Sequence, residues 1–488
     1  MKRLLLLLLL LTTPAMATDY YFDDCASGGA GTSGDPYCID PDGGGGLGDI
    51  SFAMLTNGID SGGDKEVVAG DNIILCASGC AAGGQTAIYR VATSDNSTVG
   101  GSLTRYFLGL RVSGTEANPI TVKVNCVTGT CDTIDVNGDT DADGVFDEPS
   151  GKDDPAGEPE AMIYTNAQVA SAEFMLTQLK WWVFDGNPVD TCGVDAFGYW
   201  QDCTNYLEFS HSGDHILKFN DPGVGEANPP VGPGNIVFNA VTFAHTEGMY
   251  LDTDHLWPSE NTGLLCNASG LHGMRINAIH ADVTFQNGKI HHICGSAARE
   301  NNSYRFTVKF INMEIYNVKS FVDANYFNGN FVRALVEAAN EPPGGVWTGN
   351  KLYDSAFGLS IEENTRNYEV SYNMIGCLGI WNVRPTDNNL GCGKGINISD
   401  DQANYADCDD PSCCNTGTGL CTAPPDAVGN ACTIDSDCIA RTMGGYRIFG
   451  NKIWGDPVDD ESFLDAGITR SEERRVGKEC RSRWSPYH

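Results

Sequence analysis

The amino-acid sequence predicts an all-β protein built as a right-handed parallel β-helix, a solenoid with two loop insertions. Three observations predict this fold. Short segments that alternate apolar and polar residues recur along the chain between Gly and Asn turns, a pattern typical of strands rather than helices. Asn residues return at regular spacing, 25 residues from Asn287 to Asn312 and 23 from Asn350 to Asn373. Leucine-rich repeats share this period, but their Leu-x-x-Leu-x-Leu signature is absent.

The repeating unit is too short to bury its own apolar face, so the units are expected to stack as coils around one continuous core. At equivalent turns, Asn side chains can pair their amides from one coil to the next. We therefore expect the recurring Asn residues to be structural rather than catalytic. The solenoid is predicted to span residues 65–469, after an N-terminal cap and first strand at residues 18–64.

Both ends of the chain are expected to lie outside the solenoid. Residues 1–17 hold two basic residues, eight consecutive leucines and a small-residue cleavage site, which predicts a signal peptide. Residues 470–488 are abruptly basic without hydrophobic periodicity, and they resemble a translated sequencing adapter. We therefore interpret them as a non-native tail and expect the natural chain to continue beyond Thr469. No later stretch has the apolar length of a membrane helix, so the protein is expected to be secreted, periplasmic or on a bacterial cell surface.

The charge of the remaining chain excludes several partners. Segment 1–17 holds two basic residues and segment 470–488 holds six basic and three acidic ones, which leaves 22 basic and 61 acidic residues. Such a chain is expected to repel nucleic acid and anionic membrane surfaces. This charge also argues against an anionic glycan as ligand, unless a bound cation bridges the two.

Cysteine usage indicates an oxidising compartment. Cys480 belongs to the tail, and the other 18 of the 19 cysteines are an even number that falls mostly in close pairs. Local disulfides are the expected arrangement. The close pairs are Cys25/Cys38, Cys76/Cys80, Cys126/Cys131, Cys192/Cys203, Cys266/Cys294 and Cys377/Cys392. A zinc site is the rival interpretation of segment 408–438, but it is disfavoured because two cysteines there are adjacent and histidine is absent.

Two segments interrupt the repeats and are predicted to project from the solenoid as loops. Residues 132–160 are acidic and rich in turn residues, and residues 401–442 hold six cysteines. The rest of the chain resembles the bacterial right-handed β-helix proteins of the pectin-lyase-like superfamily. The likeness is carried by the later repeats and by the N-terminal segments YYFDD, SGDPYCI, AGDNIILCASG and VSGTEANPITVKV. It covers most of residues 19–469 and implies the fold; lyases, glycoside hydrolases, epimerases and non-catalytic surface proteins all share it.

The acidic insertion contains a candidate calcium loop. Its segment DTDADGVFD alternates carboxylates before a glycine that allows a tight turn, so the carboxylates can converge on one hard cation. The candidate ligands are Asp139, Asp141, Asp143 and Asp147. The segment matches the first half of an EF-hand loop and is closer to the calcium loops of thrombospondin-type repeats. A bound Ca²⁺ is expected to stiffen the loop rather than to take part in chemistry.

The central repeats combine histidines with both acidic and basic residues. All eight histidines outside the tail lie between His211 and His292. Polar side chains on the outside of the coils are the plainer interpretation. Alternatively, stacking can bring residues one coil apart into one catalytic site. The candidate catalytic residues are Asp252, Asp254, His272, Arg305 and Lys309.

Two reactions fit these candidates. A hydrolase needs paired acids beside the scissile bond. Asp252 and Asp254 would supply them, with His272 and Arg305 orienting the sugar. This assignment has a faint resemblance to polygalacturonase motifs in the segments YLDTDH and GLHGMRI. A lyase needs a base beside a uronate and a cation to neutralise its carboxylate, and Lys309 or Arg305 would be that base.

Aromatic residues are numerous for an acidic chain, and flat sugar faces stack on exposed rings, although burial is the commoner fate of any single one. They include Trp181, Trp182, Tyr199, Trp200, Tyr250, Trp257, Trp347 and Trp381. Nucleotide-binding, serine-hydrolase and zinc-protease motifs are absent. Two functions stay open: a secreted protein that binds or cleaves an extracellular polysaccharide, and a non-catalytic envelope or adhesive scaffold. Whether the chain is an enzyme, and its oligomeric state, are not decided by the sequence.

Overall fold

The computed structural model of the protein describes strands of the solenoid and several turns between them. The described residues are 17–23, 32–33, 37–38, 67–78, 87–91, 113–126, 161–165, 174–176, 180–187, 192–212, 215–219, 234–246, 272–277, 282–294, 296–301, 307–319, 334–339, 344–353, 357–362, 367–376, 396–399, 414–415, 420–421, 446–453 and 468–470. Among these residues no helix could cross a membrane.

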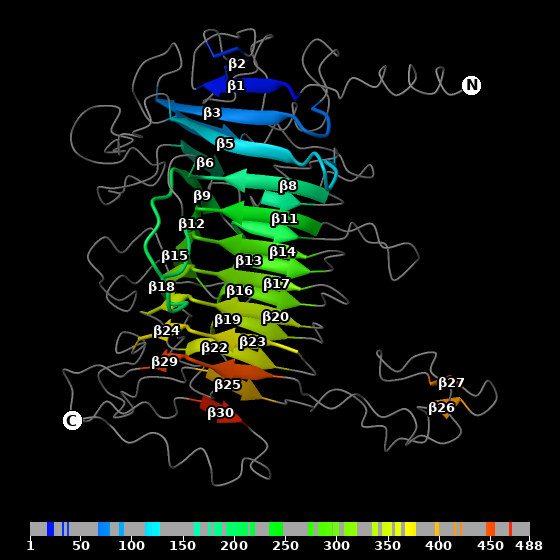
Figure 1. The fold of residues 1–488 in the computed structure, drawn as a ribbon, viewed down its shortest axis with the longest axis vertical. Helices are drawn as coiled ribbons and strands as arrows, with labels where there is room; N and C mark the ends of the chain where they lie inside the picture. Colours follow the sequence, from blue (N-terminus) through cyan, green and yellow to red (C-terminus); the bar gives the residue numbers. More distant parts are fainter. Residues whose placement is uncertain are drawn as a thin grey trace, which may run out of the picture.

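The protein is a right-handed parallel β-helix whose coils stack along one axis (Figure 1), which confirms the predicted fold class. Successive strands pass from a first sheet to a second and then to a third before the next coil begins. The first sheet holds, in spatial order, β2 (Tyr37–Cys38), β1 (Asp19–Asp23), β3 (Asn72–Ser78), β5 (Ile120–Cys126), β8 (Lys180–Asp185), β11 (Gly234–Asn239), β14 (Val283–Gln286), β17 (Val308–Ile311), β20 (Gly345–Thr348), β23 (Glu369–Ser371) and β28 (Arg447–Phe449).

The other two sheets follow the same order of coils. The second holds β4 (Ala87–Val91), β6 (Ala161–Thr165), β9 (Leu207–Ser212), β12 (Val241–Thr246), β15 (Lys289–Cys294), β18 (Glu314–Lys319), β21 (Lys351–Leu352), β24 (Met374–Ile375) and β29 (Lys452–Ile453). The third holds β7 (Phe174–Leu176), β10 (Leu217–Phe219), β13 (His272–Asn277), β16 (Ser296–Asn301), β19 (Ala334–Ala339), β22 (Phe357–Glu362), β25 (Ile396–Ser399) and β30 (Ile468–Arg470).

The core follows from the alternation of side chains along each strand. In β11, β14, β17 and β20, buried residues alternate with half-buried ones. Because the strands are parallel and in register, each inward side chain lies above the same position of the previous coil. Phe184, Phe238, Phe285 and Phe310 therefore stack through the interior, with ring centroids 4.6, 5.1 and 5.0 Å apart.

Asn residues at the turns between the first and second sheets join the coils, as the sequence predicted. The Oδ1 of Asn373 accepts hydrogen bonds from the backbone N and the Nδ2 of Asn350, at 3.0 and 2.9 Å. Asn373 in turn donates to Asn451 Oδ1 on the next coil. Earlier coils use a second ladder, in which Asn312 donates to Asn287. Asn287 and Asn312 adopt positive φ, 60° and 54°, a conformation that Asn tolerates better than most residues.

The two insertions and the tail lie largely outside the described residues. Nothing of residues 132–160 is described, and in residues 401–442 only β26 (Cys414–Asn415) and β27 (Leu420–Cys421) are, as an antiparallel pair. Of the predicted tail only Arg470 is described; it ends β30 and pairs with Ile398 of β25. The predicted signal peptide is described only at its last residue.

Candidate functional site

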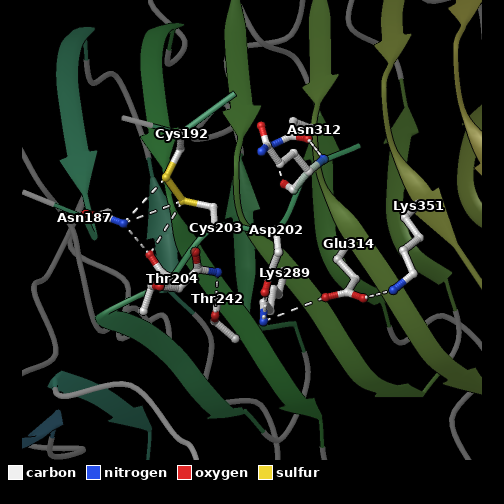
Figure 2. A network of polar contacts seen from close by, with 12 residues as sticks. Asn187, Cys192, Asp202, Cys203, Thr204, Thr242, Lys289, Asn312, Glu314 and Lys351 are labelled. Carbon is white, nitrogen blue, oxygen red and sulfur yellow. Dashed lines mark hydrogen bonds and ion pairs between the residues drawn. A yellow bond between two sulfur atoms is a disulfide. The ribbon is translucent and has the colours of Figure 1, made fainter. Parts of the chain in front are cut away.

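A chain segment that we call the strap, residues 192–206, lies along the turns between the first and second sheets. It connects β8 to β9 but extends over later coils, as the green segment beside β12, β15 and β18 shows (Figure 1). A disulfide between Cys192 and Cys203 closes its base, which confirms that predicted pair. Beside the disulfide, Asn187 Nδ2 donates to the carbonyl of Thr204 at 2.7 Å (Figure 2). Cys76 is also disulfide-bonded.

The strap is fixed to coils far away in sequence. Asn312 holds Gln201 by two hydrogen bonds: Gln201 N donates to Asn312 Oδ1 at 2.8 Å, and Asn312 Nδ2 donates to the Gln201 carbonyl at 3.0 Å. Further along, the Tyr199 hydroxyl donates to the carbonyl of Gly450 at 2.9 Å. A Cβ at Gly349 would lie only 2.4 Å from Val194 Cγ1, so this close approach requires glycine.

Beside the strap, the outer face of the second sheet carries a row of charged residues (Figure 2). Lys289, Glu314 and Lys351 lie in register on three successive strands. Glu314 Oε1 is 2.6 Å from Lys351 Nζ, and Glu314 Oε2 is 3.8 Å from Lys289 Nζ. Lys289 also lies 3.6 Å from Asp202 of the strap. Each charged group in this row therefore has a neighbour of opposite charge. Asp202, with a side chain 69% exposed, is the most accessible of the four.

Rings are stacked next to this charged row. His291, Tyr316 and Tyr353 form a column on successive coils, with centroids 5.0 and 5.1 Å apart. Lys351 Nζ lies 4.3 Å from the ring centroid of Trp200 on the strap and 4.8 Å from that of Tyr353. Cation–π contacts of this kind hold the ammonium between the strap and the sheet.

Among the described residues, the most accessible aromatic side chains lie at the far end of the strap. We call it the strap-tip patch and define it by Phe197, Tyr199, Tyr372, Phe449 and Lys452. The Phe197 side chain is 77% exposed and Phe449 is 38% exposed. Tyr372 contacts Tyr199 and Phe449 edge to face, with centroids 5.7 and 5.4 Å away, and Lys452 Nζ lies 3.6 Å from the centroid of the Tyr199 ring. Exposed rings beside a polar cation can take up the apolar face of a sugar and hydrogen-bond its hydroxyls.

Of the five candidate catalytic residues, two lie on described strands and the structure does not bring those two together. Lys309 is on β17 in the first sheet, where its Nζ forms an ion pair with Asp282 at 2.9 Å. His272 begins β13 in the third sheet. Asp252, Asp254 and Arg305 lie outside the described residues, as do Asp139, Asp141, Asp143 and Asp147 of the candidate calcium loop. In the described part of the chain, no three His, Cys, Asp or Glu residues are grouped as metal ligands.

Of the eight aromatic residues singled out in the sequence, Tyr250, Trp257 and Trp381 lie outside the described residues, and Trp181 is half-buried on β8. Trp182 and Trp347 are fully buried in the core, whereas Tyr199 and Trp200 lie half-buried on the strap. The strap itself was not predicted as a site. The signals that could have found it are the paired Cys192 and Cys203 and the aromatic residues between them.

Comparison with known proteins gives remote structural likenesses only. Pectate lyase Pel9A matches with 11% identity and a TM-score of 0.37, over 93% of this chain and 78% of that one. The GH136 lacto-N-biosidase from Eubacterium ramulus matches with 10% identity and a TM-score of 0.24, over 82% and 69%. A mannuronic acid specific family 6 lyase from human gut microbiota matches with 6% identity and a TM-score of 0.21, over 83% and 87%. Such likenesses assign no activity to this chain. No protein-family model and no curated protein sequence matches it.

Proposed function

We propose that this protein binds an extracellular polysaccharide along the strap and the neighbouring outer face of the second sheet. The observation that carries the proposal is the strap-tip patch, where Phe197 is 77% exposed and the Tyr372 ring contacts the rings of Tyr199 and Phe449. Exposed aromatic groups of this size lose favourable burial unless a partner covers them. Sugar rings present flat apolar faces that match such a surface.

The shape of the strap supports a long ligand rather than a small one. Strap contacts extend from Thr242 on β12, which bonds with Asn205, to Gly450 beyond β28. Trp200 lies between these ends, against Lys351. A polymer lying along the solenoid axis would therefore meet aromatic groups on several coils.

The binding proposal is tested by titrating the purified protein against a panel of polysaccharides, with and without calcium. We expect saturable binding of at least one polymer, and weakening of about 2- to 10-fold in Phe197→Ala and Phe449→Ala, the range of one aromatic contact. Val68→Ala is the matched control, because Val68 is also exposed, 47%, but lies before β3. No binding in the whole panel, or equal binding by all variants, would refute the proposal.

Cleavage of the bound polymer is a finer proposal. Asp252, Asp254 and Arg305 are its first candidates, because His272 and Lys309 lie on different sheets. Product analysis separates the two reactions, because elimination leaves an unsaturated sugar that absorbs ultraviolet light and hydrolysis leaves only a new reducing end. Asp254→Asn should abolish hydrolysis, and Arg305→Gln should abolish elimination, with binding retained. A polymer that is bound but yields neither product would leave binding as the function.

A rigid scaffold is the second candidate, and the anchoring of the strap favours it. The strap is fastened by a disulfide, by Asn312 and by Gly450 on widely separated coils, which resists bending between them. Under this alternative, substitutions that release the strap change the mechanical or thermal stability of the protein, and no polysaccharide in the panel binds.

A further inference from the structure

Three cationic side chains lie side by side on the outer face of the third sheet. Lys218 of β10, Arg275 of β13 and Arg299 of β16 are direct partners in register on successive strands. All three alternate with buried neighbours, such as Met274 and Ile276 at 0% exposure on either side of Arg275. Their side chains therefore point outward from the sheet and are half-buried. β13 and β16 run next to each other in the middle of the solenoid (Figure 1).

Such a row places three positive charges next to one another on one face of the sheet. Neighbouring strands are about 4.8 Å apart, and like charges directly opposite each other in a sheet destabilise it. In the second sheet, by comparison, Glu314 lies in register between Lys289 and Lys351. On the third sheet, a glutamate, Glu337, follows only after Arg299.

The row of cations contrasts with the strongly acidic composition of the whole protein. With 64 acidic and 30 basic residues, the chain has ample carboxylates to place between cations. Nevertheless, Arg275 forms no ion pair with the described residues, and its Nε is buried without a hydrogen-bond partner. A buried guanidinium nitrogen without a partner is costly, and an incoming acceptor would remove that cost.

We propose that Lys218, Arg275 and Arg299 form a binding site for an anionic group of a polymeric ligand, a carboxylate or a sulfate ester. A guanidinium presents several N–H donors in one plane and can bind either group with two parallel hydrogen bonds. The spacing of the row allows a repeating anionic polymer to engage more than one cation. This site is on a different sheet from the strap-tip patch, so it stands independently of the proposed function. It also reverses, for this one face, the expectation from net charge that an anionic glycan is disfavoured.

The test compares three oligosaccharides of equal length: an oligogalacturonate, a sulfated galacto-oligosaccharide and a neutral galacto-oligosaccharide. We expect at least one charged probe to bind more tightly than the neutral one, and Arg275→Gln to weaken that binding by about 10- to 100-fold, the range of one hydrogen bond to a charged group. The charged probe that binds identifies the anionic group. Lys123→Gln is the matched control, because it removes one positive charge from a half-buried position on β5 in the first sheet.

A second readout distinguishes a ligand site from a structural cluster. Without ligand, Arg275→Gln should melt at the same or a higher temperature than the wild type, because Arg275 forms no ion pair with the described residues that the substitution would break. The proposal is overturned by equal binding of charged and neutral probes, by unchanged binding in Arg275→Gln, or by an equal loss in Lys123→Gln. A lower melting temperature of Arg275→Gln with unchanged binding assigns the row to folding. Failure of the Phe197 and Phe449 variants to affect any ligand would refute the strap-tip patch and leave this site standing.

Discussion

Glu300 is a carboxylate at an inward position of the third sheet, where its partners in register are Ile276 and Ala338. Its side chain is 1% exposed, and the hydroxyl of Tyr368, itself fully buried, donates to Glu300 Oε2 at 2.6 Å. Burial raises the pKa of Tyr368 well above its usual value, and the nearby Glu300 carboxylate raises it further. The buried pair therefore favours a protonated tyrosine.

Because of this pair, the folding stability of the protein should depend on pH. Tyr368→Phe should remove that dependence. As pH rises, the unfolded state loses its Tyr368 proton near pH 10, whereas the folded state keeps it. The stabilisation is therefore complete below about pH 10 and decreases above it, by up to about 1.4 kcal/mol per pH unit. At neutral pH, Tyr368→Phe should cost about 1–3 kcal/mol. Urea unfolding of both proteins between pH 7 and 11 measures the difference, and a gap that stays constant above pH 10 would contradict the assignment.

The role of an individual residue could be predicted from the sequence where that residue type recurs at the coil spacing. Asn287, Asn312, Asn350 and Asn373 recur at coil spacing, so their structural role could be inferred and is confirmed by their side-chain hydrogen bonds. Glu300 occurs once and breaks the alternation rule that places carboxylates outside. No local pattern indicates that a tyrosine 68 residues away will satisfy it.

At the scale of elements, the path that the strap takes over later coils is not specified by its own sequence. The disulfide between Cys192 and Cys203 could be predicted because the cysteines are close in sequence. In contrast, Tyr199 bonds with a residue 251 positions away, and Gln201 with one 111 positions away. Loop trajectories depend on such distant contacts, whereas strands depend on local alternation. For this reason the sheets were predicted and the strap was not.

The anchoring of the strap can be tested at one pair of residues. Asn312→Ala removes both side-chain hydrogen bonds to Gln201 and should increase hydrogen exchange of residues 192–206, because each bond contributes about 0.5–1.5 kcal/mol. Gln201→Ala is the matched control, because Gln201 uses only its backbone in these bonds. Exchange that is equally fast in both variants, or unchanged in both, would show that Asn312 does not hold the strap.

The acidic insertion at residues 132–160 gives a prediction about metal binding. Alternating carboxylates at Asp139, Asp141, Asp143 and Asp147 should bind Ca²⁺ and protect this loop from proteolysis. At about 100 times its dissociation constant, the ion would stabilise the bound state by roughly 2.7 kcal/mol. Calorimetric titration measures the binding, and removal of calcium by a chelator should restore cleavage. Absence of saturable binding, or the same binding in Asp141→Ala, would exclude the site.

At the scale of the whole molecule, the stability of a solenoid depends on the contacts between neighbouring coils. The column of Phe184, Phe238, Phe285 and Phe310 passes through four successive coils of the first sheet. The sequence period predicted this stacking, because equivalent strands must superpose. It did not predict which outward residues form a site, since polar residues occupy the outer face of every coil.

Core and surface phenylalanines should therefore behave oppositely when truncated. Phe285 is fully buried between two parallel rings, so Phe285→Ala should destabilise the fold by about 3–5 kcal/mol. Because each coil contacts only its neighbours, the loss should also divide unfolding into two transitions, one on each side of the weakened coil. Phe197→Ala, at an exposed position of the strap, should leave unfolding unchanged and reduce polysaccharide binding. Differential scanning calorimetry of both variants measures this contrast. A single, unshifted transition in Phe285→Ala would mean that the column does not couple the coils.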